Sequence, residues 1–237
     1  MVVGVSNEPT GLLEKHIEKK GIAYPIAKTK GGDIDKMYGV KGFPSGAIVD
    51  PYGRIVWMGN PGGVPRSQIE ELLALTSFVP TIDDDDYKKI NKLILAQDFG
   101  KALAELDKLL VKDAENELLT AAKGDIDGLL ERKLEQADAA TQSGDYGLAV
   151  AIYADVQTFF KGTQAAKDAK LKQKAVEKDP AAKDELAAAK KMAKGDEAQM
   201  NGDFEKAAKV YKGIVKKFPE TKCAERAQAF LRRHGSL

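Results

Sequence analysis

Few residues in this chain could perform redox or metal chemistry. Among its 237 residues there are one cysteine, Cys223, and two histidines, His16 and His234. One cysteine excludes an internal disulfide, a Cys-x-x-Cys redox pair and a cysteine-based zinc site. The cations Lys222 and Arg226 could lower the pKa of Cys223, but free cysteine more often serves as a small core residue, which is the interpretation we favour. We therefore expect no catalytic residue, no metal site and no cofactor.

A run of four aspartates, Asp83 to Asp86, has the composition of a calcium ligand set. A loop of the EF-hand type needs oxygen ligands at alternate positions and a central glycine, and the run lacks that spacing. Acidic side chains are also stabilised in the first turn of a helix by the helix dipole. The run therefore favours a helix N-terminus over a calcium site.

The composition limits the kinds of partner. The formal net charge is +1, so total charge does not favour nucleic acid or an anionic membrane. Six lysines from Lys161 to Lys178 indicate a solvated helix face, because no nucleic-acid motif accompanies them. No apolar run reaches about eighteen residues, and no basic segment precedes the apolar stretch Val2 to Val5, so we expect neither a membrane span nor a signal peptide in this chain. The compartment stays open.

The composition changes near Pro80. Residues 1–80 contain 12 of the 22 glycines and 7 of the 9 prolines, whereas residues 81–237 contain only Pro180 and Pro219. Glycine and proline punctuate turns between short strands, and the later richness in Ala, Lys, Glu and Leu is typical of helices. We therefore predict two domains, a mixed α/β domain over 1–80 and an all-α domain over 81–237.

The first domain is expected to alternate strands and helices, ending in a hairpin and a helix. The hairpin turns at Asp50-Pro51-Tyr52-Gly53, where proline presets φ and glycine supplies a positive φ. Two strands this short bury little alone, so helices must cover them. In chain order the predicted elements are strand 2–6, helix 10–20, an extended segment 21–27, helix 33–38, strands 46–50 and 54–58, and helix 66–75.

The segment GIAYPIAKTKGGDIDKMYGVKGFPSGAIVDPYGRIVWMGNPG resembles the second half of a thioredoxin-like domain of the TlpA or redoxin type. The resemblance lies in YGVKGFPSG, the hairpin that follows it, and the W-x-G motif of Trp57 to Gly59. It covers about a third of the chain. It implies that Pro44 is preceded by a cis peptide bond, and that Phe43, Pro44 and Ser45 offer backbone to an extended peptide substrate. Proteins of the TlpA type are generally exported by bacteria, so an extracytoplasmic location would follow if the intact gene product carries a signal.

The redox motif that the resemblance implies, a Cys-x-x-Cys opening a helix after a strand, is missing and would lie upstream of Met1. The missing strand would fall between the strands at 2–6 and 46–50. Its loss would leave unpaired N–H and C=O groups on both. Either the chain is incomplete or another strand fills the gap, and a homodimer formed by strand exchange is one way to fill it.

The second domain repeats one pattern three times, Asp-aromatic-x-x-Ala-x-x-x-bulky, in stretches that begin at Asp98, Asp145 and Asp203. Each Asp is a candidate helix N-cap, and Gly144 and Gly202 precede two of them in a position suited to a left-handed turn; Gln97 stands there in the first copy. The pattern resembles tetratricopeptide repeats, although its spacings of 47 and 58 residues exceed their usual period of about 34. A plain helical bundle is the alternative. The repeat residues are Phe99, Ala102, Tyr146, Ala149, Tyr153, Phe204, Ala207, Tyr211 and the closing Pro219.

Two functions follow from these patterns. We favour a thioredoxin-like protein without its redox pair that binds a protein or peptide partner through the helical repeats and the Pro44 face. The alternative is a truncated thiol–disulfide oxidoreductase or redoxin whose Cys-x-x-Cys segment lies upstream of Met1.

Overall fold

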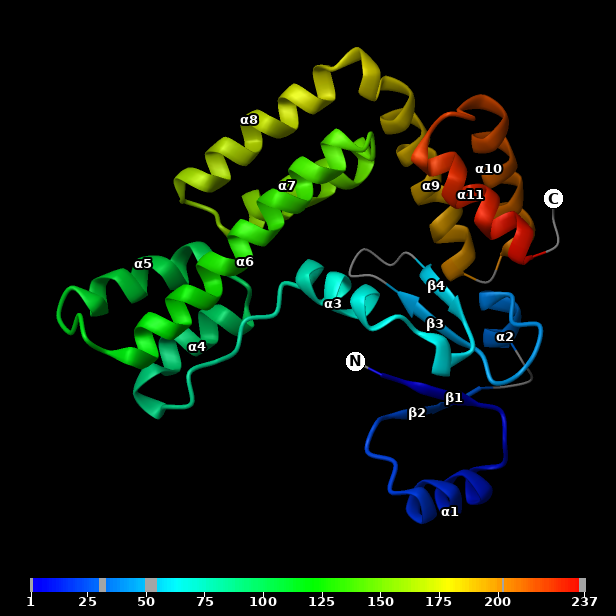
Figure 1. Cartoon of the computed structure of the whole chain (residues 1–237), viewed down its shortest axis with the longest axis horizontal. Coiled ribbons are helices and arrows are strands. Elements are labelled where there is room, and N and C mark those ends of the chain that lie inside the picture. Colours follow the sequence, from blue (N-terminus) through cyan, green and yellow to red (C-terminus); the bar gives the residue numbers. More distant parts are fainter. Residues whose placement is uncertain (1, 30–32, 50–54, 202, 235–237) are drawn as a thin grey trace.

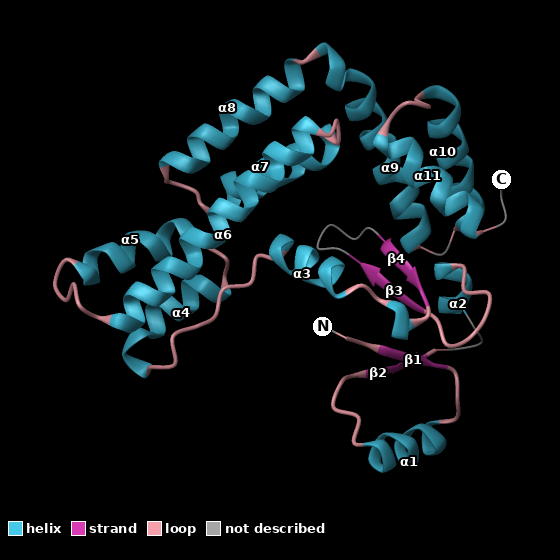
Figure 2. Ribbon diagram, in the orientation of Figure 1, coloured by secondary structure: helices cyan, strands magenta, loops and turns pink. Residues whose placement is uncertain are grey.

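The computed structural model describes residues 2–29, 33–49, 55–201 and 203–234. The protein is mostly helical with two small sheets (Figures 1 and 2). The helices after residue 80 form an arch, and the strands lie together beneath one end of it (Figure 1).

The first part of the chain has the alternation predicted from its sequence, with strand ends shifted by one or two residues. The strands are short because glycine and proline interrupt them. The predicted turn from Asp50 to Gly53 lies outside the described residues. The elements are β1 (Gly4–Ser6), α1 (Thr10–Lys20), β2 (Ile26–Lys28), α2 (Asp33–Tyr38), β3 (Gly46–Val49), β4 (Ile55–Gly59), a 3-10 turn (Pro61–Gly63) and α3 (Arg66–Leu75).

The four strands form two separate sheets in the described part of the chain. Strand β1 pairs in parallel with β2, with Gly4 opposite Ile26. Strand β3 pairs antiparallel with β4, with Gly46 opposite Gly59. Each of the four strands thus has one unpaired edge among the described residues.

This first part has almost no interior. Among residues before Val79 whose burial the structure describes, none is fully buried. Large apolar side chains are instead exposed on its strands, helices and loops: Val2, Val3, Val5, Leu12, Tyr24, Phe43, Val49, Ile69, Leu73 and Phe78.

The helical part begins where the four aspartates lie. The side chain of Asp84 accepts a hydrogen bond of 2.8 Å from the backbone N–H of Asp86 and caps a 3-10 turn (Asp85–Tyr87). This confirms the helix N-terminus predicted from the aspartate run. The helices are α4 (Lys88–Leu95), α5 (Phe99–Leu110), α6 (Glu117–Gln142), α7 (Tyr146–Phe159), α8 (Gln164–Lys178), α9 (Lys183–Met200), α10 (Phe204–Lys217) and α11 (Lys222–Arg233), with a 3-10 turn (Pro180–Ala182) before α9.

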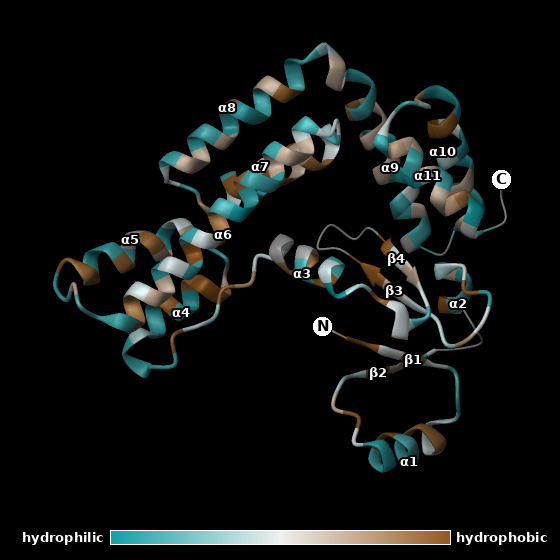
Figure 3. Ribbon diagram, viewed as in Figure 1, coloured by the Kyte–Doolittle hydropathy of each residue, from teal (hydrophilic) through white to brown (hydrophobic). Residues whose placement is uncertain are grey.

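The helices enclose two apolar cores. The first runs from Val79 to Ala182 and the second from Ala188 to Leu231. Apolar residues lie on the facing sides of the helices, and polar residues cover the outer sides (Figure 3). Helix α3 packs against α6, which links the first part of the chain to the arch (Figure 1).

Candidate functional site

The residues predicted to contact a peptide form the loop between α2 and β3. The Phe43–Pro44 peptide bond is cis, as the resemblance implies. The side chain of Phe43 is 78% exposed, Pro44 is exposed and Ser45 is half-buried. Because Ser45 directly precedes β3, the loop leads into the unpaired edge of that strand. Backbone at such an edge can pair with an extended chain.

The repeat pattern marks helix starts, and its residues are structural. Asp98, Asp145 and Asp203 each cap a helix by accepting a hydrogen bond from the backbone N–H three residues later, at 3.4, 3.3 and 3.1 Å. This confirms the predicted N-caps. The repeat alanines and the side chains of Phe99, Tyr153 and Tyr211 are buried, Tyr146 and Phe204 are half-buried, and Pro219 is exposed after α10.

The glycine positions before these caps behave as expected where they are described. Gly144 has φ of 78° and Gln97 has φ of 55°, so both take the left-handed conformation. Gly202 lies outside the described residues. Gln97 thus adopts a backbone conformation that glycine takes at lower cost.

A buried tyrosine–aspartate hydrogen bond occurs in two of the repeat copies. The Tyr153 hydroxyl donates to Asp138 at 2.5 Å, and the Tyr211 hydroxyl donates to Asp196 at 2.6 Å. Burial and the Asp138 carboxylate raise the pKa of Tyr153 to about 12. The motif analysis missed these pairs, although both join residues 15 apart in sequence, which is a detectable signal.

Cys223 lies in a buried polar cluster between α9 and α11. Its thiol donates a hydrogen bond to Glu185 Oε1 at 3.2 Å and accepts one from Arg226 at 3.0 Å. Burial raises the pKa of Cys223 to about 12, even though Arg226 opposes the shift. The interpretation as a core residue is confirmed, and the alternative of a lowered pKa is wrong because desolvation outweighs the nearby cation.

Arg226 on α11 links the start of α7 to α9. Its guanidinium donates to Asp145 Oδ2 at 2.9 Å and to Glu185 Oε1 at 3.4 Å. Asp145 begins α7, Glu185 lies in α9 and Arg226 lies in α11. Sequence reasoning missed this cluster because its members are up to 81 residues apart.

No group of three or more potential metal ligands occurs among the described residues. Within the same described part of the chain, no helix is long and apolar enough to cross a membrane.

Comparison with known proteins gives one partial relative. A stretch of 70 residues is 27% identical to the thiol-disulfide oxidoreductase ResA of Halalkalibacterium halodurans, covering 30% of this chain and 39% of that protein. No family model and no solved structure matches the chain. The similarity supports a thioredoxin-like relationship.

Proposed function

We propose that this protein is a thioredoxin-like peptide-binding protein that holds its partner without redox chemistry of its own. The observation that carries the proposal is the exposed pair Phe43 and Pro44 in the loop that continues directly into β3, a strand with one edge unpaired among the described residues. Because a β edge offers its N–H and C=O groups at fixed spacing, an extended peptide gains main-chain hydrogen bonds there. The buried Cys223 has no part in this site.

The exposed aromatic Phe43 supplies an anchor for such a peptide. The side chain of Phe43 is 78% exposed, so covering it with a partner removes apolar surface from water and makes the free energy of binding more favourable. The helical repeats would offer a second binding surface for the partner, because stacked helix pairs of the tetratricopeptide kind present concave faces to proteins.

A binding experiment with a matched control tests the role of this loop. The probe is reduced and alkylated α-lactalbumin labelled with fluorescein, an unfolded chain that cannot form a disulfide. We expect Phe43→Ala to weaken binding about tenfold and Phe78→Ala to leave it unchanged. Phe78 is a fair control because it is 75% exposed and lies beyond α3. Equal affinity for all three proteins would contradict the proposed site, and insulin reduction with dithiothreitol by this polypeptide would contradict the non-redox role.

The same open edge of β3 has an alternative occupant, and we propose a homodimer in which a strand of a second copy lies between β1 and β3 and competes with the peptide. The exposed side chains of Val5 in β1 and Val49 in β3 would lose water contact in such an arrangement. Light scattering over a range of protein concentrations tests the proposal. A monomeric mass at the highest concentration would contradict it.

A second candidate function is favoured by the similarity to ResA. In that proposal the chain is part of a thiol–disulfide oxidoreductase, and a Cys-x-x-Cys segment encoded upstream supplies both the missing strand and the redox pair. Reading the DNA upstream of Met1 tests it: an in-frame stop codon with no Cys-x-x-Cys codons after it would rule the candidate out.

A further inference from the structure

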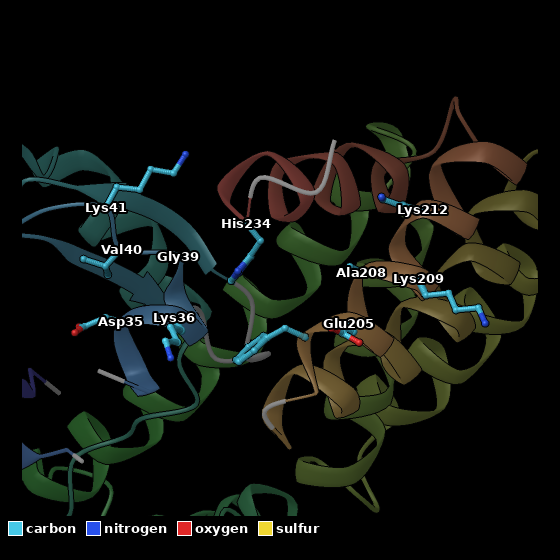
Figure 4. Close-up of a pocket in the computed structure, with 11 residues that line it drawn as sticks. Asp35, Lys36, Gly39, Val40, Lys41, Glu205, Ala208, Lys209, Lys212 and His234 are labelled. Carbon is cyan, nitrogen blue, oxygen red and sulfur yellow. The ribbon is translucent and has the colours of Figure 1, made fainter. Parts of the chain in front are cut away.

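A cleft of about 780 Å³ lies between the first part of the chain and the third repeat copy (Figure 4). One wall is formed by α2 and the loop that follows it, including Lys36 and Lys41. The other wall is formed by α10, including Lys209 and Lys212, and His234 lies between the two walls. Residues more than 160 positions apart in sequence therefore face one space.

The charge in the cleft is uneven. Four lysines line it against two acids, Asp35 and Glu205. Within the described part of the chain none of these lysines forms an ion pair, in contrast to Lys172 and Lys222, which pair with acids. Ammonium groups that share a concave surface repel one another and attract anions from solution. The cleft is thus suited to carboxylates.

Part of the cleft is aromatic. The ring of Phe204 stacks on His234 with 5.6 Å between centroids and 16° between planes. The ring of Phe230 holds His234 from another side at 4.2 Å. Phe204 and His234, together with Val40 and Ala208, give the cleft an apolar surface beside its lysines. A ligand that combines carboxylates with an apolar group would match both features.

The cleft also adjoins the proposed peptide loop. Lys41 is two residues from Phe43, so their Cα atoms are at most about 7 Å apart. A polypeptide that contacts Phe43–Ser45 can therefore continue past Lys41 into the cleft.

From this geometry we infer that the cleft binds an acidic segment of the partner polypeptide, rich in glutamate or aspartate and carrying an aromatic or aliphatic residue. The inference rests on the proposed function and adds the chemistry of the partner. The lysines select the carboxylates, and the Phe204–His234 stack receives the apolar side chain.

Two synthetic peptides of about twelve residues test the inference, one with about six glutamates and one phenylalanine, the other with glutamine at each glutamate. Fluorescence anisotropy at about 50 mM salt measures their affinities, because low salt preserves exposed charge interactions. We expect the glutamate peptide to bind about tenfold more tightly. Lys209→Glu with Lys212→Glu should abolish this preference.

The matched control is Lys167→Glu with Lys170→Glu on α8. These lysines are exposed, have the same spacing and lie outside the cleft, so the change in net charge is identical. The control should keep the preference within about twofold. An equal loss in both double variants, or oligothymidylate of equal charge binding as tightly as the peptide, would overturn the inference.

The outcomes also separate this inference from the proposed function. If both peptides bind equally well and Phe43→Ala weakens both, the proposed function stands and the acidic preference is wrong. If neither peptide binds but unfolded α-lactalbumin does, the inference is wrong and the proposed function stands; if none of the three binds, both are wrong.

Discussion

The two parts of this chain bury their apolar residues very differently. None of the residues before Val79 whose burial the structure describes is fully buried, whereas the helices from α4 to α11 enclose two cores. Both parts contain helices, so helix content does not explain the difference. The difference lies in how many neighbours each element has.

Sheets and helix pairs reach stability by different routes. A two-stranded sheet is marginal in water unless more strands or helices cover it. A helix pair buries one stripe locally, and each further pair adds a contact to its neighbour. The first part of the chain therefore depends on what covers its two small sheets, and the helical part does not.

The largest expected effect contrasts two phenylalanines. Phe99 is fully buried and contacts the rings of Phe159 and Phe160, at 6.2 and 5.5 Å between centroids. Phe99→Ala should lower the free energy of unfolding by about 4 kcal/mol. Phe78→Ala, at a site 75% exposed, should change it by less than about 0.5 kcal/mol. Urea unfolding followed by circular dichroism measures both, and similar losses would contradict the contrast.

The next largest effect concerns the close approach of α5 to the backbone that follows α7. A Cβ at Gly100 would lie 2.2 Å from the backbone oxygen of Lys161, which cannot rotate away. Gly100→Ala should therefore cost about 3 kcal/mol. Gly213 in α10 has no such neighbour within 4 Å, so Gly213→Ala should stabilise the protein by about 0.7 kcal/mol. If Gly100→Ala also stabilised the protein against unfolding, the contact at Gly100 would not be tight.

A smaller effect follows from the raised pKa of Cys223. Its pKa is about 12 in the folded protein against an ordinary value of 9.0, so the folded state retains the proton that the unfolded chain releases above pH 9. The stability linked to this thiol is present below pH 9 and is lost as the pH rises from 9 to 12. At pH 10 the loss should be about 1 kcal/mol. The variant Cys223→Ser has no thiol, so its free energy of unfolding should not show this decrease above pH 9. The same pH dependence of unfolding free energy in both proteins would contradict the prediction.

The smallest effect concerns the left-handed turns between paired helices. Gln97→Gly removes the steric cost of φ at 55° and should stabilise the helical part by about 0.7 kcal/mol. The reciprocal change Gly144→Ala, at φ of 78°, should destabilise it by about 1 kcal/mol. Thermal unfolding measures both shifts. Destabilisation by Gln97→Gly would mean that the hydrogen bond from Gln97 to Ser77 matters more than the turn.

Local signals accounted for much of the fold. Asp98, Asp145 and Asp203 begin helices because a short acidic side chain satisfies a free N–H at that point. The strand and helix order of the first part was predictable from its glycines, prolines and apolar runs. The unusual repeat spacing was visible but unexplained: α6 continues for 26 residues, and α8 follows α7 as an additional helix.

The candidate sites also divide into those marked by a local motif and those formed by residues distant in the sequence. The loop Phe43–Ser45 was found through its motif. The basic cleft was not, because Lys41 and Lys212 lie 171 positions apart in the sequence and no local pattern encodes their approach. The cluster of Cys223, Glu185 and Arg226 likewise depends on the packing of α9 against α11.

The sequence by itself determined where helices begin, where the chain changes from α/β to all-α, and that Cys223 has no partner for disulfide chemistry. These are local or compositional properties, set by capping, periodicity and residue counts. Only the tertiary structure decided that desolvation raises the pKa of Cys223, that two sheets stay separate among the described residues, and that four lysines share one cleft. Burial and electrostatic fields depend on which distant residues come together, and that information exists only once the helices and strands have packed.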